Sequence, residues 1–80
     1  MISISKETSH SVDEVMRRAS DFFGSKGLGL EGKARNACCI NFEGGGGYVS
    51  VTVVEGEGKR DVDIEAREWE YQAKRFLETI

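Results

Sequence analysis

Residues 38–65 decide the fold, and they read CCINFEGGGGYVSVTVVEGEGKRDVDIE. Apolar and polar side chains alternate on both sides of the glycine run from Gly44 to Gly47, and again beyond a second turn signal at residues 55–58. Alternation with a period of two is typical of strands that bury one face. A third turn signal lies upstream at residues 34–36. Residues 28–65 therefore predict four antiparallel strands joined in sequence as a meander.

The three turns also predict how the strands align. Closing the glycine loop places Ile40 opposite Val51, closing the second turn places Val51 opposite Val62, and closing the first turn places Leu30 opposite Ile40. These three alignments agree, because each turns the apolar residues to one face and the polar residues to the other. We therefore expect a sheet with one apolar and one polar face.

The polar face is predicted as cross-strand rows of neighbouring side chains. The rows read Glu31, Cys39, Thr52, Asp61; then Gly29, Asn41, Ser50, Asp63; and, nearest the glycine loop, Glu43, Tyr48, Glu65.

In the segments before and after the predicted strands, apolar residues recur at the spacing of a helix. Ser11 and Glu14 form a capping box before a helix predicted over residues 12–23, and the apolar residues from Ala66 to Ile80 predict a second helix. Ile2 and Ile4 alternate with serines, which predicts a short strand whose partner stays open.

The predicted fold is a single α+β domain over residues 1–80, a two-layer sandwich in the order β-α-β-β-β-β-α. Two helices, each about 10 Å wide, roughly cover four or five strands spaced about 4.8 Å apart. We therefore expect the antiparallel meander to carry both helices on its apolar face.

Composition and charge exclude several function classes. The chain has 80 residues and a net charge of −3, which disfavours a nucleic-acid partner because a phosphate backbone calls for a basic face. No stretch of about 20 apolar residues predicts a membrane span. No charged and apolar leader opens the sequence, so we expect a cytoplasmic location.

The two cysteines are adjacent, at positions 38 and 39. Neighbours on a strand point to opposite faces, so we expect two free thiols and no disulfide. The pair lacks the spacing of a zinc or redox motif, and His10 is the only histidine. We therefore expect no metal and no cofactor.

Asn41, Ser50 and Asp63 place amide, hydroxyl and carboxylate groups within reach of one another on the polar face, with Cys39 and Thr52 beside them. A hydrolytic triad needs a base between acid and nucleophile, and the only histidine precedes the first helix. We therefore expect no catalytic residues and interpret these side chains, with Tyr48, as contacts for a ligand or partner.

The strand Ile2-x-Ile4, the His10-Ser11 pair entering an amphipathic helix, and the meander that follows resemble the small polyhydroxyalkanoic acid system family of bacterial granule-associated proteins. The resemblance spans about Ile2 to Val54. This sequence differs from the family pattern in the glycine run and in the acidic strand from Asp61 to Glu65. It implies a bacterial accessory protein of storage-polymer granules, and no catalytic residue carries over.

The leading hypothesis is a non-enzymatic interaction module of bacterial type that forms a homodimer through its open sheet face or an edge strand. A small domain with one core gains stability by burying its second face. Tyr48, Ala37, Cys39 and Val54 would give that contact its apolar part.

The alternative is a small-molecule binder or minor enzyme that uses Tyr48, Asn41, Ser50 and Asp63 beneath the loop from Gly44 to Gly47. Four glycines exceed the need of a tight turn, so this hypothesis expects a mobile loop. The ligand is not indicated.

Overall fold

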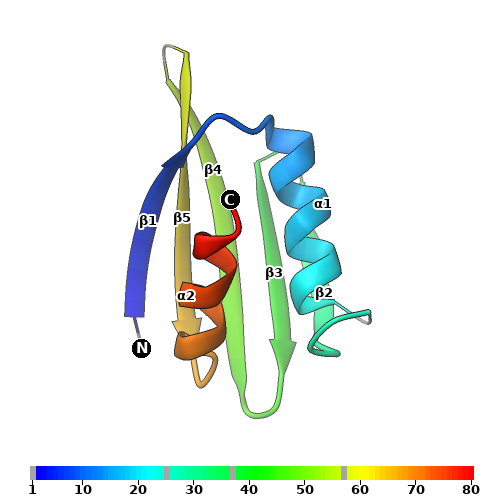
Figure 1. The fold of residues 1–80 in the computed structure, drawn as a ribbon. Helices are drawn as coiled ribbons and strands as arrows, with labels where there is room; N and C mark the ends of the chain where they lie inside the picture. Colours follow the sequence, from blue (N-terminus) through cyan, green and yellow to red (C-terminus); the bar gives the residue numbers. More distant parts are fainter. Residues whose placement is uncertain (1, 25, 37, 57) are drawn as a thin grey trace.

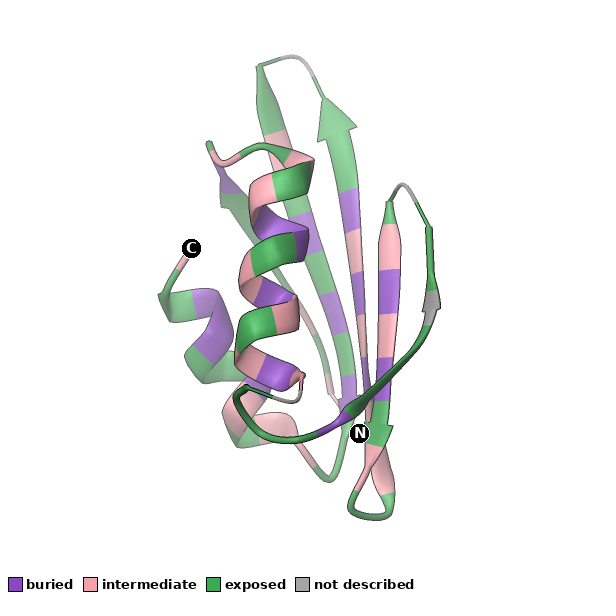
Figure 2. Cartoon of the chain, turned by 90° about the vertical axis from the view of Figure 1, so that its right-hand side faces the viewer, coloured by how far each residue is buried: buried purple, intermediate pink, exposed green. Residues whose placement is uncertain are grey.

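The computed structural model describes residues 2–24, 26–36, 38–56 and 58–80. It contains a five-stranded antiparallel sheet and two helices, so the expected α+β class is confirmed (Figure 1). The elements are β1 (Ile2–Thr8), α1 (Val12–Phe23), β2 (Glu31–Arg35), β3 (Cys39–Gly44), β4 (Gly47–Gly56), β5 (Lys59–Arg67) and α2 (Glu70–Glu78). Both helices lie on the same face of the sheet, and no described segment covers the other face (Figure 2).

The strands follow the order β1-β5-β4-β3-β2 across the sheet. Strands β2 to β5 form the predicted meander, and β1 pairs with β5 from Ile2 opposite Ala66 to Thr8 opposite Arg60. The partner of the first strand is therefore the last strand. The chain then passes through α1 to reach β2, so β1 and β2 form the two opposite edges of the sheet.

Helix α1 has the bounds that the capping box and the apolar spacing predict. The Glu14 N–H donates to Ser11 Oγ over 3.1 Å, and the Gly24 N–H donates to Ser20 O over 2.9 Å at the other end. The buried stripe of the helix comprises Val15, Met16, Ala19 and Phe23.

Helix α2 begins later than the apolar spacing predicts. Ala66, expected on the helix, is instead buried in β5 opposite Val49. Glu68 then adopts a φ of 71°, and Trp69 precedes the first helical residue. Alanine at position 66 fits both the period of a helix and the period of a strand. The residue joins the strand because pairing with β4 provides hydrogen-bond partners for the backbone groups.

One of the three predicted alignments is confirmed, and two are wrong. Between β3 and β4, Ile40 lies opposite Val51 as predicted. Between β4 and β5, Val51 lies opposite Ile64 and not opposite Val62. The turn lies one residue later than expected and uses Gly58, whose φ of 70° favours glycine. The resulting shift of two residues keeps the side chains of residues 61–65 on their predicted faces.

The β2–β3 alignment differs because β2 is bulged. Gly32 lies opposite Phe42 and Arg35 opposite Ile40, so two β2 residues face one β3 residue between these pairs. The first turn also comes later than predicted, since the Asn36 N–H donates to Cys39 O over 2.9 Å. The expected pairs of Leu30 with Ile40, Glu31 with Cys39 and Gly29 with Asn41 are therefore wrong.

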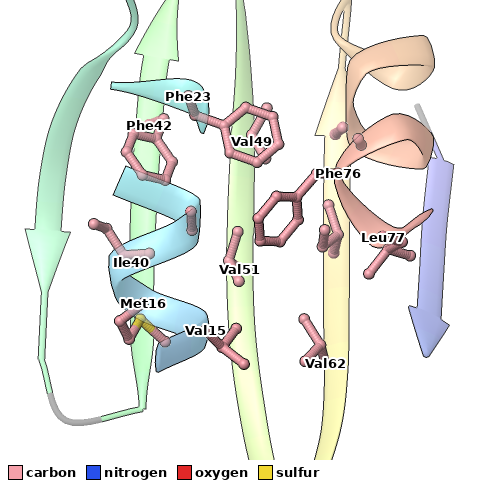
Figure 3. Close-up of a cluster of buried hydrophobic side chains, with 14 of the residues drawn as sticks. Val15, Met16, Phe23, Ile40, Phe42, Val49, Val51, Val62, Phe76 and Leu77 are labelled. Carbon is pink, nitrogen blue, oxygen red and sulfur yellow. The ribbon is translucent and has the colours of Figure 1, made fainter. Parts of the chain in front are cut away.

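The core lies between the apolar sheet face and the two helices (Figure 3). Phe23 of α1 lies with its ring centroid 5.3 Å from that of Phe76 in α2 and 5.4 Å from that of Phe42 in β3. Val49 and Val51 of β4 are fully buried beneath these rings. The surfaces left for function are the open sheet face, the two sheet edges and any part of the apolar face that the helices leave uncovered.

Candidate functional site

The open face is built from four rows of side chains that run across the strands. The rows read Glu7, Asp61, Val54; Ser5, Asp63, Thr52, Cys39; Ser3, Glu65, Ser50, Asn41; and Arg67, Tyr48, Glu43, Glu31. All six residues predicted for the site lie in these rows. The β1 serines and Arg67 also lie on this face. The sequence alone does not predict this, because it leaves open the partner of β1 and the end of β5.

Asn41 and Ser50 lie opposite each other as predicted, but Asp63 does not join them. The Ser50 Oγ–H donates to Asn41 Oδ1 over 2.7 Å. Glu65 occupies the β5 position opposite Ser50, and Asp63 lies opposite Thr52 in the next row. The expected row of Asn41, Ser50 and Asp63 is therefore wrong, because it relied on the β4–β5 alignment that is shifted by two residues.

A line of carboxylates follows β5 along the open face. Asp61, Asp63 and Glu65 are exposed, and none forms an ion pair with a described residue. Asp63 lies between Ser5 of β1 and Thr52 of β4, and Glu65 has serines on both sides. Within the described ranges, no three His, Cys, Asp or Glu side chains are grouped to hold a metal ion. The line makes the open face electronegative.

The residues expected to give an apolar contact on this face do not form one patch. Tyr48 lies in the row of Arg67 and Glu43, whereas Val54 lies six residues further along β4 and is 51% exposed. Six strand residues span roughly 20 Å. Ala37 lies outside the described residues. The apolar area of the open face is therefore divided between its two ends.

The glycine run forms a tight turn. Gly44 pairs with Gly47, while Gly45 and Gly46 take φ values of 58° and 82°, which fit a type I′ hairpin. The Trp69 Nε1–H donates to Gly44 O over 2.8 Å. A Cβ on Gly45 would lie 2.7 Å from the Trp69 ring, so the absence of a side chain lets the indole pack against the turn. The glycine run therefore forms the hairpin turn that the sequence predicts, anchored from the helix side, and the mobility expected of it stays a prediction.

The adjacent cysteines are joined by a disulfide, so the expectation of two free thiols is wrong. Cys38 is exposed, and Cys39 lies half-buried on the open face opposite Thr52. Cys38 lies at the turn, just before β3 begins at Cys39, and its N–H donates to Asn36 Oδ1 over 3.1 Å. The rule that neighbours point to opposite faces holds only where both residues belong to one strand.

The two sheet edges differ in regularity. Strand β1 pairs with β5 along all seven of its residues without a bulge. Lys6 points toward the helices, where its Nζ donates to Leu77 O over 2.8 Å, and Glu7 pairs with Lys59 at 3.2 Å. Strand β2 is bulged between Gly32 and Arg35, a feature that protects an edge from pairing.

A groove of about 450 Å³ lies on the helix side of the sheet, between α1 and β2. Its lining residues are Ser20, Gly24, Leu30, Glu31, Gly32, Lys33, Arg35, Ile40 and Phe42. None of these residues was predicted for a site. The signal in the sequence is Gly32, which interrupts the apolar positions of the second strand.

Among the described residues, the carboxylate with the most strongly shifted pKa lies on α1, away from the open face. Hydrogen bonds from the Arg17 and Arg18 side chains lower the pKa of Glu14 from 4.5 to about 2. The distances to Glu14 Oε2 are 2.5 Å from Arg17 Nη2 and 2.7 Å from Arg18 Nε. Glu14 is thus an ion-paired surface residue of the helix and no candidate acid.

Within the described ranges, neither helix is long and apolar enough to cross a membrane. The resemblance of residues 2–54 to the polyhydroxyalkanoic acid system family stays a prediction. Comparison with known proteins finds no matching family model, no matching curated protein and no matching solved structure.

Proposed function

We propose that this protein is a non-enzymatic interaction module that self-associates through the outer edge of β1. The observation that carries the proposal is the regularity of this edge. Seven residues lie in an unbroken ladder with β5, and no described segment pairs with their other side. Such a row of backbone N–H and C=O groups is a template for another strand.

The edge is a better self-association surface than the open face. Contact between two open faces would bring together two lines of carboxylates, from Asp61 to Glu65, at a cost in Coulomb repulsion. Such a contact would also lack a single apolar centre, because Tyr48 and Val54 lie at opposite ends of the open face. Pairing at the edge leaves the carboxylates in water.

A symmetric antiparallel pair of β1 strands is free of like-charge contacts. With Ser5 opposite Ser5 of the second copy, Ile4 faces Lys6 and Ser3 faces Glu7 across the twofold axis. Lys6 keeps its hydrogen bond to Leu77 O of its own chain. The result is a continuous ten-stranded sheet with all four helices on one face.

The interface is small, and this sets the expected affinity. Seven paired residues from each copy bury less than the roughly 800 Å² per partner that stable complexes use. We therefore expect a dimer that dissociates on dilution. We expect the cytoplasm as its location, where the bond between Cys38 and Cys39 would exchange with cellular thiols.

Sedimentation of the protein between about 10 μM and about 1 mM tests the proposal. In the monomer, Ser5 lies beside Asp63, so a Ser5→Lys substitution gains an opposite charge and keeps the fold. At the twofold axis it places two ammonium groups opposite each other. We expect the wild type to dimerise and Ser5→Lys to weaken the dimer severalfold.

Ser3→Lys is the matched control, because Ser3 lies beside Glu65 in the monomer and would face Glu7 of the second copy. It should leave the dimer intact or strengthen it. A wild type that remains monomeric at about 1 mM, or equal dimerisation of the wild type and Ser5→Lys, would contradict self-association through β1.

The alternative function, small-molecule binding on the polar face, has less support. Ser50 and Asn41 form a hydrogen bond with each other over 2.7 Å, and Asp63 lies in another row. The turn from Gly44 to Gly47 is anchored by Trp69 from the helix side and so gives no cover to this face.

A further inference from the structure

The disulfide between Cys38 and Cys39 lies at the surface, where β3 begins. Cys38 is exposed, and Cys39 is half-buried on the open face. A disulfide stabilises a fold mainly by restraining the unfolded chain, and this effect grows with the length of the loop that it closes. A bond between neighbouring residues closes the shortest of loops and restrains the unfolded chain very little. It is therefore a poor structural cross-link.

The same argument determines how readily the bond is reduced. Folding and disulfide formation are linked, so the fold stabilises the bond by the same factor by which the bond stabilises the fold. This factor is about fivefold for the shortest loop, against about 30-fold or more for a typical structural disulfide. The folded protein therefore holds the disulfide only slightly more tightly than the unfolded chain does, which leaves it open to exchange with small thiols.

Three hydrogen bonds hold the backbone of the two cysteines without involving their sulfur atoms. The Cys38 N–H donates to Asn36 Oδ1 over 3.1 Å, and the Val53 N–H donates to Cys38 O over 2.8 Å. The Asn36 N–H donates to Cys39 O over 2.9 Å. Cleavage of the S–S bond removes none of these donors or acceptors. We therefore expect the two thiols to stay close together and to re-form the bond readily.

Asn36 adds a contact that favours the reduced pair. Its Oδ1 lies 3.2 Å from Cys38 Sγ. In the disulfide this sulfur carries no hydrogen, whereas in the dithiol its S–H can donate to the amide oxygen. The side chain of Asn36 thus positions Cys38 in both redox states.

The two sulfur atoms differ in access to a nucleophile. Cys39 lies opposite Thr52, in the row that also holds the Asp63 carboxylate two strands away, at about 10 Å. A thiolate that approaches Cys39 over the open face meets this negative charge and a half-buried side chain. Cys38 lies before the first residue of β3 and is exposed. Its sulfur is therefore the more accessible atom.

We propose that Cys38 and Cys39 form a redox-active pair that exchanges with low-molecular-weight thiols, and that Cys38 Sγ is the atom attacked. A small thiolate bonds to Cys38 Sγ, the S–S bond of the pair breaks, and Cys39 leaves as a thiolate that takes up a proton from water. A second small thiolate attacks the sulfur of the first, and the Cys38 thiolate leaves and is protonated. The protein gains two electrons and two protons, and the two small thiolates become one disulfide.

The reverse sequence oxidises the pair. The Cys38 thiolate attacks a small disulfide and releases one small thiolate, and Cys39 then displaces the second one to close the ring. Cys39 is thus the resolving thiol. The pair lies on β3, which β4 and β5 separate from β1, so this site does not depend on the proposed dimer.

Two single-cysteine variants test which sulfur reacts. Cys39→Ser leaves only the thiol of Cys38, and Cys38→Ser leaves only that of Cys39. We expect oxidised glutathione to form a mixed disulfide with Cys39→Ser at least about tenfold faster than with Cys38→Ser, as measured by intact mass after acid quenching. In urea, where both thiols are exposed, the two rates should agree within about twofold. Equal rates in the folded variants would overturn the assignment of Cys38.

The wild type tests the exchange itself. Mixtures of reduced and oxidised glutathione, followed by alkylation of free thiols and mass measurement, give the ratio of disulfide to dithiol. We expect one two-electron transition, with the folded protein about fivefold harder to reduce than the protein in urea. A difference above about 30-fold, or loss of the far-ultraviolet circular dichroism on reduction, would refute a redox-active pair. Ser5→Lys should exchange as the wild type does, whether or not the dimer forms.

Asn36→Ala tests the positioning of the pair. It removes the acceptor of the Cys38 N–H and should slow ring closure from the mixed disulfide at least about threefold, with little change in the first attack. Asn41→Ala is the matched control, because the Asn41 side chain lies on the same strand and accepts from Ser50 Oγ–H over 2.7 Å. Equal closure rates in the two variants would contradict the role of Asn36.

Discussion

The anchored glycine turn leads to a comparison between two neighbouring substitutions, Gly45→Ala and Gly46→Ala. Both glycines have positive φ, 58° and 82°, so each alanine costs about 1–2 kcal/mol in backbone strain. The surroundings of the added methyl groups differ. On Gly45 the Cβ would lie 2.7 Å from Cζ2 of Trp69, whereas on Gly46 it meets nothing within 4 Å.

The additional cost at Gly45 is set by how Trp69 responds. If the indole stays, overpacking costs about 1–3 kcal/mol. If it moves away, the bond from Trp69 Nε1–H to Gly44 O is lost, at about 1 kcal/mol, together with part of its packing. Either way Gly45→Ala should be less stable than Gly46→Ala by about 1–3 kcal/mol.

Urea unfolding followed by far-ultraviolet circular dichroism measures this difference. A chain of 80 residues is expected to have about 4–12 kcal/mol of stability, so both variants should still fold. Trp69 is the only tryptophan, so its fluorescence should change in Gly45→Ala and remain unchanged in Gly46→Ala. Equal stabilities with the same emission spectrum would refute the packing of Trp69 on the turn.

Two other predictions concern the disulfide and the charges of α1. Reducing the bond between Cys38 and Cys39 should lower the stability by only about 1 kcal/mol, because it closes the shortest of loops; a loss above about 3 kcal/mol in urea unfolding with a reductant would contradict this. Since Arg17 and Arg18 lower the pKa of Glu14 to about 2, its stabilising effect is present above about pH 4.5 and is lost as the pH falls toward 2. The wild type should therefore lose more stability than Glu14→Gln across that range, and equal losses in a series of urea unfolding curves would exclude the effect.

Local signals predicted α1 well, because both of its ends are marked within a few residues. Ser11 and Glu14 cap its start, and Gly24 follows its last residue. The predicted start of α2 was wrong because Ala66 suits either a strand or a helix. Only its pairing with Val49 decides between them.

For the candidate site, the sequence predicted correctly which face of the sheet each residue lies on, but not which residues lie beside one another. Alternation assigns Asn41, Ser50 and Asp63 to one side of the sheet, and a shift of two residues preserves that assignment while changing which side chains meet. The turn at Gly58 and the bulge after Gly32 determined the actual neighbours. The position of a turn and the presence of a bulge depend on local backbone geometry. The alternation of apolar and polar residues does not predict either of them.

The amino-acid sequence alone determined the element order, the bounds of α1 and the faces of β3, β4 and residues 61–65 of β5, because these depend on periodicity and capping. The tertiary structure decided that β1 joins β5, that Trp69 closes on the glycine turn, and that the helices leave the inner side of β2 uncovered. These features arise from contacts between residues far apart in the chain and from the widths of the two layers. They become defined only when sheet and helices are assembled.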